Sequence, residues 1–222
     1  MTVVLEVGTV AMELQAEHPG LGLLSTTVHA RAGRSSLDSK RRLRMLSDRH
    51  RGAQAMVLRT RPVPFAYRVF YRHVGVDPDA DHTPVEAAML ERLLRGGFRA
   101  RDLVEDALTI ALVETGVPIW ALDDDLLDGA LELRLARAGE RLGRAPEAAA
   151  VSEGQIVVCD RGGPLQVLFG PLPDAQRVTR GTLRIRLFTV AVAGVSSLEV
   201  EEAFWTCTNL LDQEPPGATV GA

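Results

Sequence analysis

The stretch GVPIWALD, residues 116–123, decides the fold of this chain, because a helix ends and a strand begins within it. The preceding residues, LVEDALTIALVET (103–115), have the composition of a helix, and Gly116 is a natural helix stop because glycine readily adopts the left-handed backbone. The apolar run VPIWAL (117–122) is typical of a buried strand. Asp123, Asp124 and Asp125 then form an acidic turn. The segment therefore predicts a helix leading directly into a strand.

Upstream, the stretch TPVEAAMLERLLRGG (83–97) carries the clearest helix start in the sequence. Thr83 and Glu86 form a capping-box pattern, Pro84 occupies the first helical position, and Gly96 and Gly97 end the helix. The same cap pattern predicts two further helices. Its residues there are Asp102 with Glu105 and Ser196 with Glu199.

Two more helices are expected before residue 80. In SLDSKRRLRMLSDRH (36–50) the leucines at positions 37, 43 and 46 lie near one face of a basic helix. In FAYRVFYRHVG (65–75) the spacing predicts a buried stripe and an opposite basic side. The predicted stripe is Phe65, Val69 and Phe70, and the predicted basic side is Arg68 with Arg72.

Strands are expected on both sides of these helices. The first 35 residues read as strands, with alternation clearest over 21–32, and apolar segments follow at 130–136, 155–160, 164–169 and 183–194. Residues 160–163 (DRGG) suit a hairpin turn. The order predicts an α+β fold with mixed or antiparallel sheets and a central group of helices. We expect a single domain over 1–211 and a disordered tail over 212–222.

Composition excludes several protein classes. No apolar run is long enough to cross a membrane, and the N-terminus lacks the pattern of a signal peptide, so we expect a cytoplasmic protein. Cys159 and Cys207 lie far apart and are expected to be reduced. The turn DPDADH (77–82) lacks the glycine of a calcium loop. We predict neither a metal nor a cofactor.

Four segments in order resemble the B3/B4 domain of the phenylalanyl-tRNA synthetase β subunit. They are GVPIWALD (116–123), LRLARAGERL (133–142), SEGQIVVCDRGGPL (152–165) and RVTRGT (177–182). The helix at 83–97 is similar to one found in free-standing members. The resemblance covers roughly residues 60–211 and implies a B3/B4-like fold.

In the synthetase, this domain recognises mischarged tyrosine on tRNA and hydrolyses the ester. The resemblance therefore implies recognition of tRNA or aminoacyl-tRNA, with deacylation in trans as a candidate activity. It implies a ligand pocket formed by Pro118, Trp120, Phe169, Gly170, Arg184, Arg186 and Phe188. No catalytic residue can be assigned.

Two departures weaken tyrosine editing. Trp120 stands where the family has a pocket histidine, and Phe188 stands where it has the acidic residue that recognises the tyrosine hydroxyl. Neither side chain supplies a buried acceptor for a phenol. A pocket lined by them favours an apolar or aromatic group, or a stacked base.

Arginines offer two further candidate sites. Ten basic residues fall between Arg31 and Arg61, and the densest group, Arg41, Arg42 and Arg44, is a candidate for binding RNA phosphates. The alternative is a solvated helix face. Arg184 and Arg186 share one strand face and either bind an anion in the cleft or lie on an exposed surface.

Three functions remain open from the sequence. The chain could hydrolyse misacylated tRNA, it could bind an amino acid or other small ligand in the B3/B4 cleft without catalysis, or it could bind RNA through its N-terminal arginines. Whether it is an enzyme is not decided by the residues.

Overall fold

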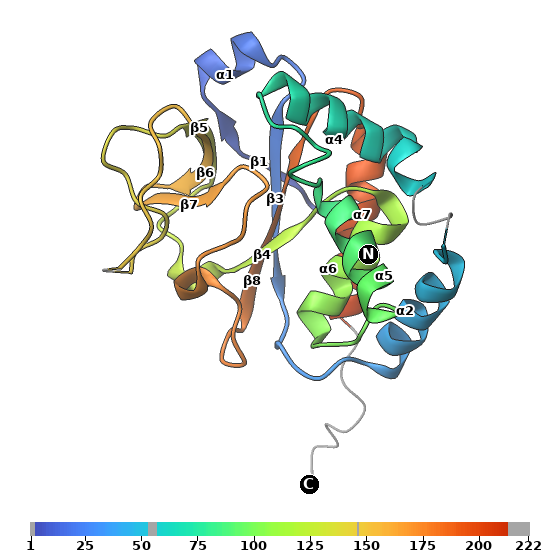
Figure 1. The fold of residues 1–222 in the computed structure, drawn as a ribbon. Helices are drawn as coiled ribbons and strands as arrows, with labels where there is room; N and C mark the ends of the chain where they lie inside the picture. Colours follow the sequence, from blue (N-terminus) through green and yellow to red (C-terminus); the bar gives the residue numbers. More distant parts are fainter. Residues whose placement is uncertain (1–2, 53–56, 146, 213–222) are drawn as a thin grey trace, which may run out of the picture.

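We analysed a computed structural model of the 222-residue chain, which describes residues 3–52, 57–145 and 147–212 (Figure 1). The predicted disordered tail falls, from residue 213 onward, outside the described residues. The described chain forms two four-stranded sheets and a group of helices.

The central sheet is antiparallel and has the strand order β1-β3-β8-β4. Its long strands β3 and β8 pair over eight residues, from Gly22 opposite Ala191 to His29 opposite Arg184. The short strand β4 places Trp120 directly opposite Phe188. The strand bounds are β1 (Glu6–Val7), β3 (Gly22–His29), β8 (Arg184–Ala191) and β4 (Trp120–Asp123).

The second sheet has the order β2-β5-β6-β7, with β2 parallel to β5 and the other pairs antiparallel. Asp160 pairs with Gly163 at the tip of the β6–β7 hairpin, which confirms the turn predicted over 160–163. The mixed α+β class is likewise confirmed. The strand bounds are β2 (Thr9–Val10), β5 (Glu132–Leu135), β6 (Ile156–Asp160) and β7 (Gly163–Val167).

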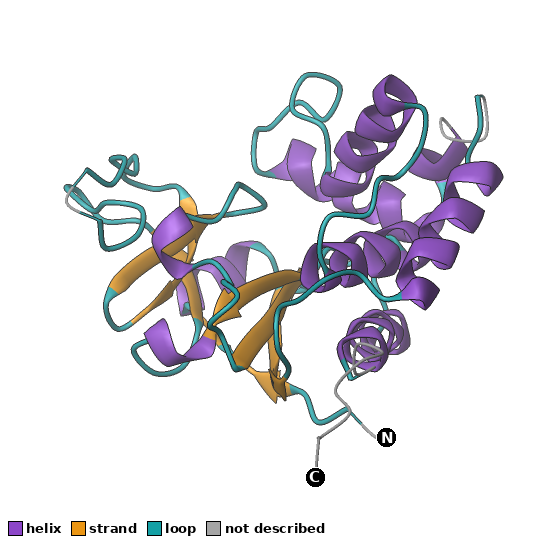
Figure 2. Ribbon diagram, turned by 90° about the horizontal axis from the view of Figure 1, so that it is seen from below, coloured by secondary structure: helices purple, strands orange, loops and turns teal. Residues whose placement is uncertain are grey.

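Most of the helices gather on one side of the central sheet, and the second sheet lies on the other side (Figures 1 and 2). The longest described helix, α7, packs against α6. The helices are α1 (Met12–Glu17), α2 (Leu37–Arg49), α4 (Pro62–His73), α5 (Pro84–Arg95), α6 (Leu103–Thr115) and α7 (Ser197–Leu211). Short 3-10 turns are η1 (Leu58–Thr60), η2 (Asp124–Leu126) and η3 (Asp174–Gln176).

The predicted helix starts form by the local bonds that the sequence suggests. Capping boxes are present at the start of α5 (Thr83 with Glu86) and of α7 (Ser196 with Glu199). Asp102 caps α6 differently, because its side chain accepts from the backbone N–H groups of Val104 and Glu105. Three helix starts were therefore predictable from neighbouring residues alone.

Replacing Ser196 by alanine is expected to lower the free energy of unfolding by about 1 kcal/mol. The change removes a hydroxyl that accepts from Glu199 N–H and donates to the Glu199 carboxylate. Chemical denaturation would measure the change. Ser197→Ala, one residue further on and equally exposed, is the matched control, and an equal loss in both variants would contradict the capping role.

Three predicted details are wrong. Residues 12–17 form helix α1 rather than strand, because MELQAE consists of good helix formers and buries Leu14 against the core. Leu37 is exposed at the start of α2, while Leu43 and Leu46 are buried as predicted. In α4 Phe70 is buried and Arg72 exposed as predicted, but Phe65 is half exposed and Arg68 is buried.

One hydrophobic cluster runs from Leu14 to Leu211 and joins the helices to both sheets. We propose on this ground that residues 1–211 fold as one unit. None of the helices in the described ranges combines the length and apolar character needed to cross a membrane.

The second sheet carries an ion pair that should make stability depend on pH. Arg134 donates two hydrogen bonds to Glu140, at 2.9 and 2.7 Å, and these lower the pKa of Glu140 from 4.5 to about 2. Because the folded-state pKa is depressed, the stabilisation is present above pH 4.5 and is lost as the pH falls toward 2. We expect Glu140→Gln to remove this part of the acid dependence.

Denaturant unfolding at several pH values between about 2 and 6 would test this expectation. Glu132→Gln, a carboxylate on the same sheet without an ion pair among the described residues, is the control. If the parent and Glu140→Gln lose stability in parallel over this range, the pair does not carry the effect.

Candidate functional site

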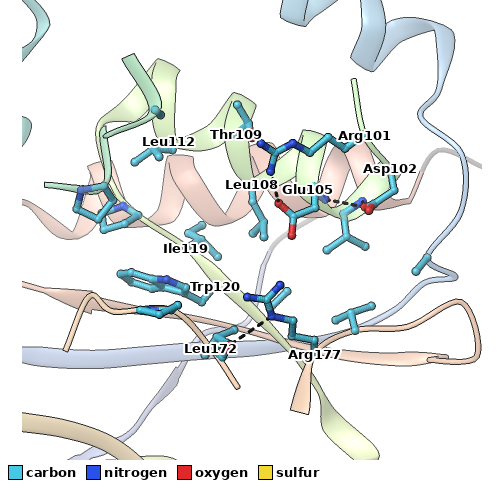
Figure 3. Close-up of a pocket in the computed structure, with 18 of the residues that line it drawn as sticks. Arg101, Asp102, Glu105, Leu108, Thr109, Leu112, Ile119, Trp120, Leu172 and Arg177 are labelled. Carbon is cyan, nitrogen blue, oxygen red and sulfur yellow. Dashed lines mark hydrogen bonds and ion pairs between the residues drawn. The ribbon is translucent and has the colours of Figure 1, made fainter. Parts of the chain in front are cut away.

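A cleft of about 1070 Å³ opens between the helices and one end of the central sheet (Figure 3). One wall comes from α5 and α6, and the facing wall comes from β4 and the loop before β8. The side chain of Leu108 projects from α6 toward the wall that carries Trp120 and Leu172, and Thr109 and Leu112 also line the cleft. Small-ligand sites typically have volumes of about 300–1000 Å³, so this cleft has room for a ligand of nucleoside size or larger.

The GVPIWALD segment is fixed in place by contacts from distant parts of the chain. Gly116 has a φ of 82°, and a side chain there would meet Pro64 at 2.8 Å, so glycine is required both for the turn and for the close approach. Thr189 donates a 2.6 Å hydrogen bond to the carbonyl oxygen of Pro118. Asp123 accepts a 2.5 Å bond from Thr182. The segment forms one wall of the cleft, and these contacts hold it in place.

Trp120 lies on this wall and is held by aromatic neighbours. Its ring stacks with Phe188, the residue opposite it on β8, at 5.7 Å between centroids, and with Phe169 at 5.9 Å. Phe169 in turn stacks on Tyr71 of α4 at 5.3 Å. The indole is only partly buried and lines the cleft, so part of its surface is accessible to a ligand.

The rim of the cleft carries both signs of charge. Arg101 is shared between Glu91 and Glu105, the second at 3.7 Å. Arg177 donates to the carbonyl oxygen of Leu172 at 3.2 Å and pairs with Asp174 at 3.3 Å. Arg34 and Arg180 also line the rim and have no ion pair within the described part of the chain. Arg34 and Arg180 are therefore rim cations that are available to an anionic ligand.

The cleft offers carboxylates and threonines for chemistry. Among the described residues that line it, none is a serine, cysteine or histidine. Asp102 is used as the cap of α6, and Glu91 is held by Arg95 and Arg101. Within the described residues Glu105 has one ion pair, at 3.7 Å to Arg101, which leaves it the least engaged carboxylate of the cleft.

The predicted pocket residues fall into three positions. Pro118 and Trp120 line the cleft. Phe188 is fully buried behind Trp120, and Phe169 lies beside it, so both support the indole. The carbonyl oxygen of Gly170 accepts a hydrogen bond from the Gln166 side chain, and Gly170 does not border the cleft within the described chain.

Arg184 and Arg186 share one strand face, as the sequence indicates, but both bind the buried carboxylate of Asp124. Arg184 also pairs with Asp125, and Arg186 with Glu6. The acidic turn that follows β4 thus neutralises the two arginines, and neither lines the cleft in the described residues. Their place in the fold favours a structural ion-pair network.

The three arginines of α2 that were predicted to bind RNA differ in their contacts. Arg42 donates to both oxygens of Glu114 on α6, which ties α2 to its neighbour. Arg41 and Arg44 are exposed and have no ion pair to a described residue. Of the three arginines proposed on α2, Arg41 and Arg44 are therefore the ones that the described residues leave available to an anion.

Several cleft residues were not singled out from the sequence, chiefly Glu105, Arg101, Arg177 and Arg180. A signal was available for one wall. In α6 the positions 105, 109 and 112 follow helical spacing and form a face separate from the fully buried one. The described residues include no group of acidic, histidine or cysteine side chains that could hold a metal.

Comparison with known proteins agrees with this architecture. The B3/4 domain family matches residues 66–196 of the chain, which include α6, β4 and the loops of the cleft. The chain is also similar to phenylalanine–tRNA ligase beta subunits. That of Thiobacillus denitrificans is 35% identical over 109 residues, covering 47% of this chain and 14% of that protein.

The beta subunit of Xanthomonas euvesicatoria pv. vesicatoria is 36% identical over 119 residues, covering 51% of this chain and 14% of that protein. That of Xanthomonas campestris pv. campestris is 44% identical over 68 residues, covering 31% and 8%. The chain therefore spans only a small part of the length of these relatives. Because the family match extends over more than half of the sequence, this chain belongs to the B3/4 domain family.

Proposed function

We propose that the chain recognises the aminoacylated 3′ end of a tRNA in this cleft. The observation that carries the proposal is a partly exposed Trp120, fixed by two aromatic neighbours, on the wall of a cleft large enough for an aminoacyl nucleoside. The relatives are named as subunits of a ligase that acts on phenylalanine and tRNA, which supports a tRNA-related role.

The shape of the cleft suits a single-stranded RNA end. Unpaired bases and aromatic side chains stack on exposed aromatic rings, and such stacking contributes about 1–3 kcal/mol per base. Arginines at the rim, Arg34 and Arg180 among them, would meet the backbone that leaves the cleft. The apolar residues Leu108, Leu112 and Leu172 would contact the amino-acid side chain.

A fluorescence experiment tests the location of binding. The probes are hydrolysis-resistant aminoacyl-adenosine analogues, in which an amide replaces the ester, carrying a set of apolar, aromatic and polar amino acids. We expect at least one analogue to change the emission of the parent chain and of Trp205→Phe, but not that of Trp120→Phe. Trp205 is the matched control, because it lies on α7 and does not line the cleft.

If no analogue and no aminoacyl-tRNA binds, the proposal fails. If the response follows Trp205 instead of Trp120, the site is elsewhere. Either result would overturn the assignment of the cleft.

Deacylation of misacylated tRNA is the candidate activity of this cleft, and a substitution of Glu105 tests it. In a trans-editing enzyme this carboxylate is the candidate to hold and deprotonate the attacking water, because its neighbours Asp102 and Glu91 are already bonded. Glu105→Gln should then abolish release of the amino acid from misacylated tRNA while analogue binding is retained.

The alternative is a non-catalytic binding module on the same fold. The lack of a serine, cysteine or histidine among the described residues of the cleft, and Trp120 in place of the family histidine, favour it. Binding without deacylation of any mischarged tRNA, at high protein concentration, would decide for the module.

A further inference from the structure

Four arginines surround a second, smaller pocket at the end of α5. The pocket has a volume of about 50 Å³, where one water molecule needs about 10–15 Å³, so it has room for a group of a few atoms. Glu91 is the one acidic residue among its described lining residues. The arginines are Arg92, Arg95, Arg99 and Arg101.

This basic pocket, defined by those four arginines, adjoins the large cleft. Ala88, Glu91, Arg101 and Thr109 line both. In Figure 3, Arg101 and Thr109 lie together at the α6 wall of the cleft. A ligand that fills the cleft and continues past α6 would therefore enter the basic pocket.

The positive charges of the basic pocket are only partly compensated. Arg95, at 3.1 Å, and Arg101 share the single carboxylate of Glu91, and Arg101 also lies 3.7 Å from Glu105. Arg92 and Arg99 have no carboxylate partner in the described residues. This excess stands out in a chain whose net charge is −4.

Arg92 is the most unusual member. It is only 8% exposed, and its Nε–H has no hydrogen-bond acceptor among the described residues, while Nη2 donates to the carbonyl oxygen of Ser47 at 2.7 Å. A guanidinium so far removed from water is costly unless a negative charge lies near it. A bound anion in the pocket would supply that charge.

The loop that carries Arg99 and Arg101 is held at both ends. Phe98 N–H donates to Ser47 Oγ at 2.7 Å, and Arg101 N–H donates to Asp106 at 2.9 Å. The backbone at Gly96 is left-handed, with a φ of 74°, and ends α5 there. The backbone of this loop is thus fixed before any ligand binds, which lowers the entropy cost of binding.

Helix electrostatics accounts for only part of the cluster. Arg92 and Arg95 lie in the last turn of α5, where cations stabilise the helix dipole. Arg99 and Arg101 lie beyond the end of the helix, outside the reach of that effect. A second reason is needed for their convergence on one pocket.

We propose that the basic pocket binds a backbone phosphate of the RNA whose 3′ end occupies the cleft. The inference rests on the proposed function and extends it, because it adds a phosphate contact at the end of α5, rather than at the arginines of α2, to those proposed for the rim of the cleft. Several guanidinium groups around a small pocket match the geometry and charge of a phosphodiester. Continuity with the cleft places that phosphate close to the terminal nucleosides.

The test compares two double variants that each remove two exposed arginines. Arg95→Ala with Arg99→Ala removes half of the basic pocket. Arg137→Ala with Arg141→Ala is the charge-matched control, in the exposed loop after β5 of the second sheet. Binding of bulk tRNA without an attached amino acid is measured over a range of salt concentrations, and binding of the aminoacyl-adenosine analogue is measured in parallel.

We expect the pocket variant to bind tRNA at least about fivefold more weakly. The slope of log affinity against log salt concentration should fall by the equivalent of about one phosphate contact or more. The control variant should keep the tRNA affinity and the salt dependence of the parent chain. The pocket variant should keep its affinity for the analogue, which has no phosphate. Equal losses in the two double variants, or no loss in the pocket variant, would overturn the proposal.

Absence of tRNA binding by the parent chain would also overturn it. If the parent still binds the analogue in that case, only the phosphate site fails. If it binds neither probe, the proposed function fails as well.

Discussion

Replacing Trp120 by alanine is expected to weaken binding of the aminoacyl-adenosine analogue roughly ten- to a hundredfold, from the about 1–3 kcal/mol that a stacking side chain contributes. The indole is the largest aromatic surface on the cleft wall, and its ring is already fixed by Phe169 and Phe188. Little entropy is therefore lost when a ligand stacks on it. Isothermal titration of the parent and the variant would measure the change.

The same change also removes contacts with Phe169 and Phe188, so folding must be followed separately. Trp120→Phe retains an aromatic ring and should lose much less affinity. Trp205→Ala, at a half-exposed position on α7, should lose none. An alanine variant with native circular dichroism and unchanged affinity would show that the indole is not part of the binding surface.

The second large effect is expected from Arg68. Its replacement by alanine should lower the free energy of unfolding by about 3–5 kcal/mol, because a buried ion pair is broken and one charge is left uncompensated. Arg68 is 6% exposed and bonds Glu86 and, at 2.7 Å, Asp79. These contacts join α4 to α5 and to the turn before it. Denaturant unfolding near neutral pH would give the value.

Arg72 on the same helix is the matched control. It is half exposed and its nitrogen lies 3.9 Å from Asp79, so Arg72→Ala should change stability by less than about 1 kcal/mol. Adding Glu86→Gln to Arg68→Ala should recover part of the loss, because it removes the uncompensated carboxylate. Similar losses for Arg68→Ala and Arg72→Ala would refute the buried pair.

Local features of the fold were predictable with good accuracy. The caps at Thr83 and Ser196, the helix stop at Gly116 and the hairpin at 160–163 depend on residues only a few positions apart. Their hydrogen bonds form within one turn of chain, so a single sequence contains all the partners. The α+β class follows from the order of such elements.

The buried face of α4 was not predictable, because both stripes of that helix are apolar enough to be core. Phe65 and Val69 stand on one stripe, and Tyr67 and Tyr71 on the other. Which stripe is buried depends on contacts with β8, where the carbonyl oxygen of Val190 accepts a 3.0 Å hydrogen bond from the Tyr67 hydroxyl. Arg68 is then carried into the interior, where Glu86 and Asp79 compensate its charge.

The candidate site shows the same division. The sequence indicated that Trp120 would matter, since it stands on the strand that carries the family pattern, and the fold places it on the cleft wall. It also indicated that Arg184 and Arg186 share a face. That the face meets Asp124, some 60 positions earlier, required the pairing of β4 with β8.

By itself, the sequence determined the family, the class of fold, the helix boundaries marked by caps and glycines, and the segment that forms one wall of the cleft. The tertiary structure alone decided which arginines are neutralised, which lie around the basic pocket, and which carboxylate of the cleft remains free. The physical reason is distance along the chain. Capping and turn formation act between near neighbours, whereas the charge and burial of a side chain depend on partners that only folding brings within a few ångströms.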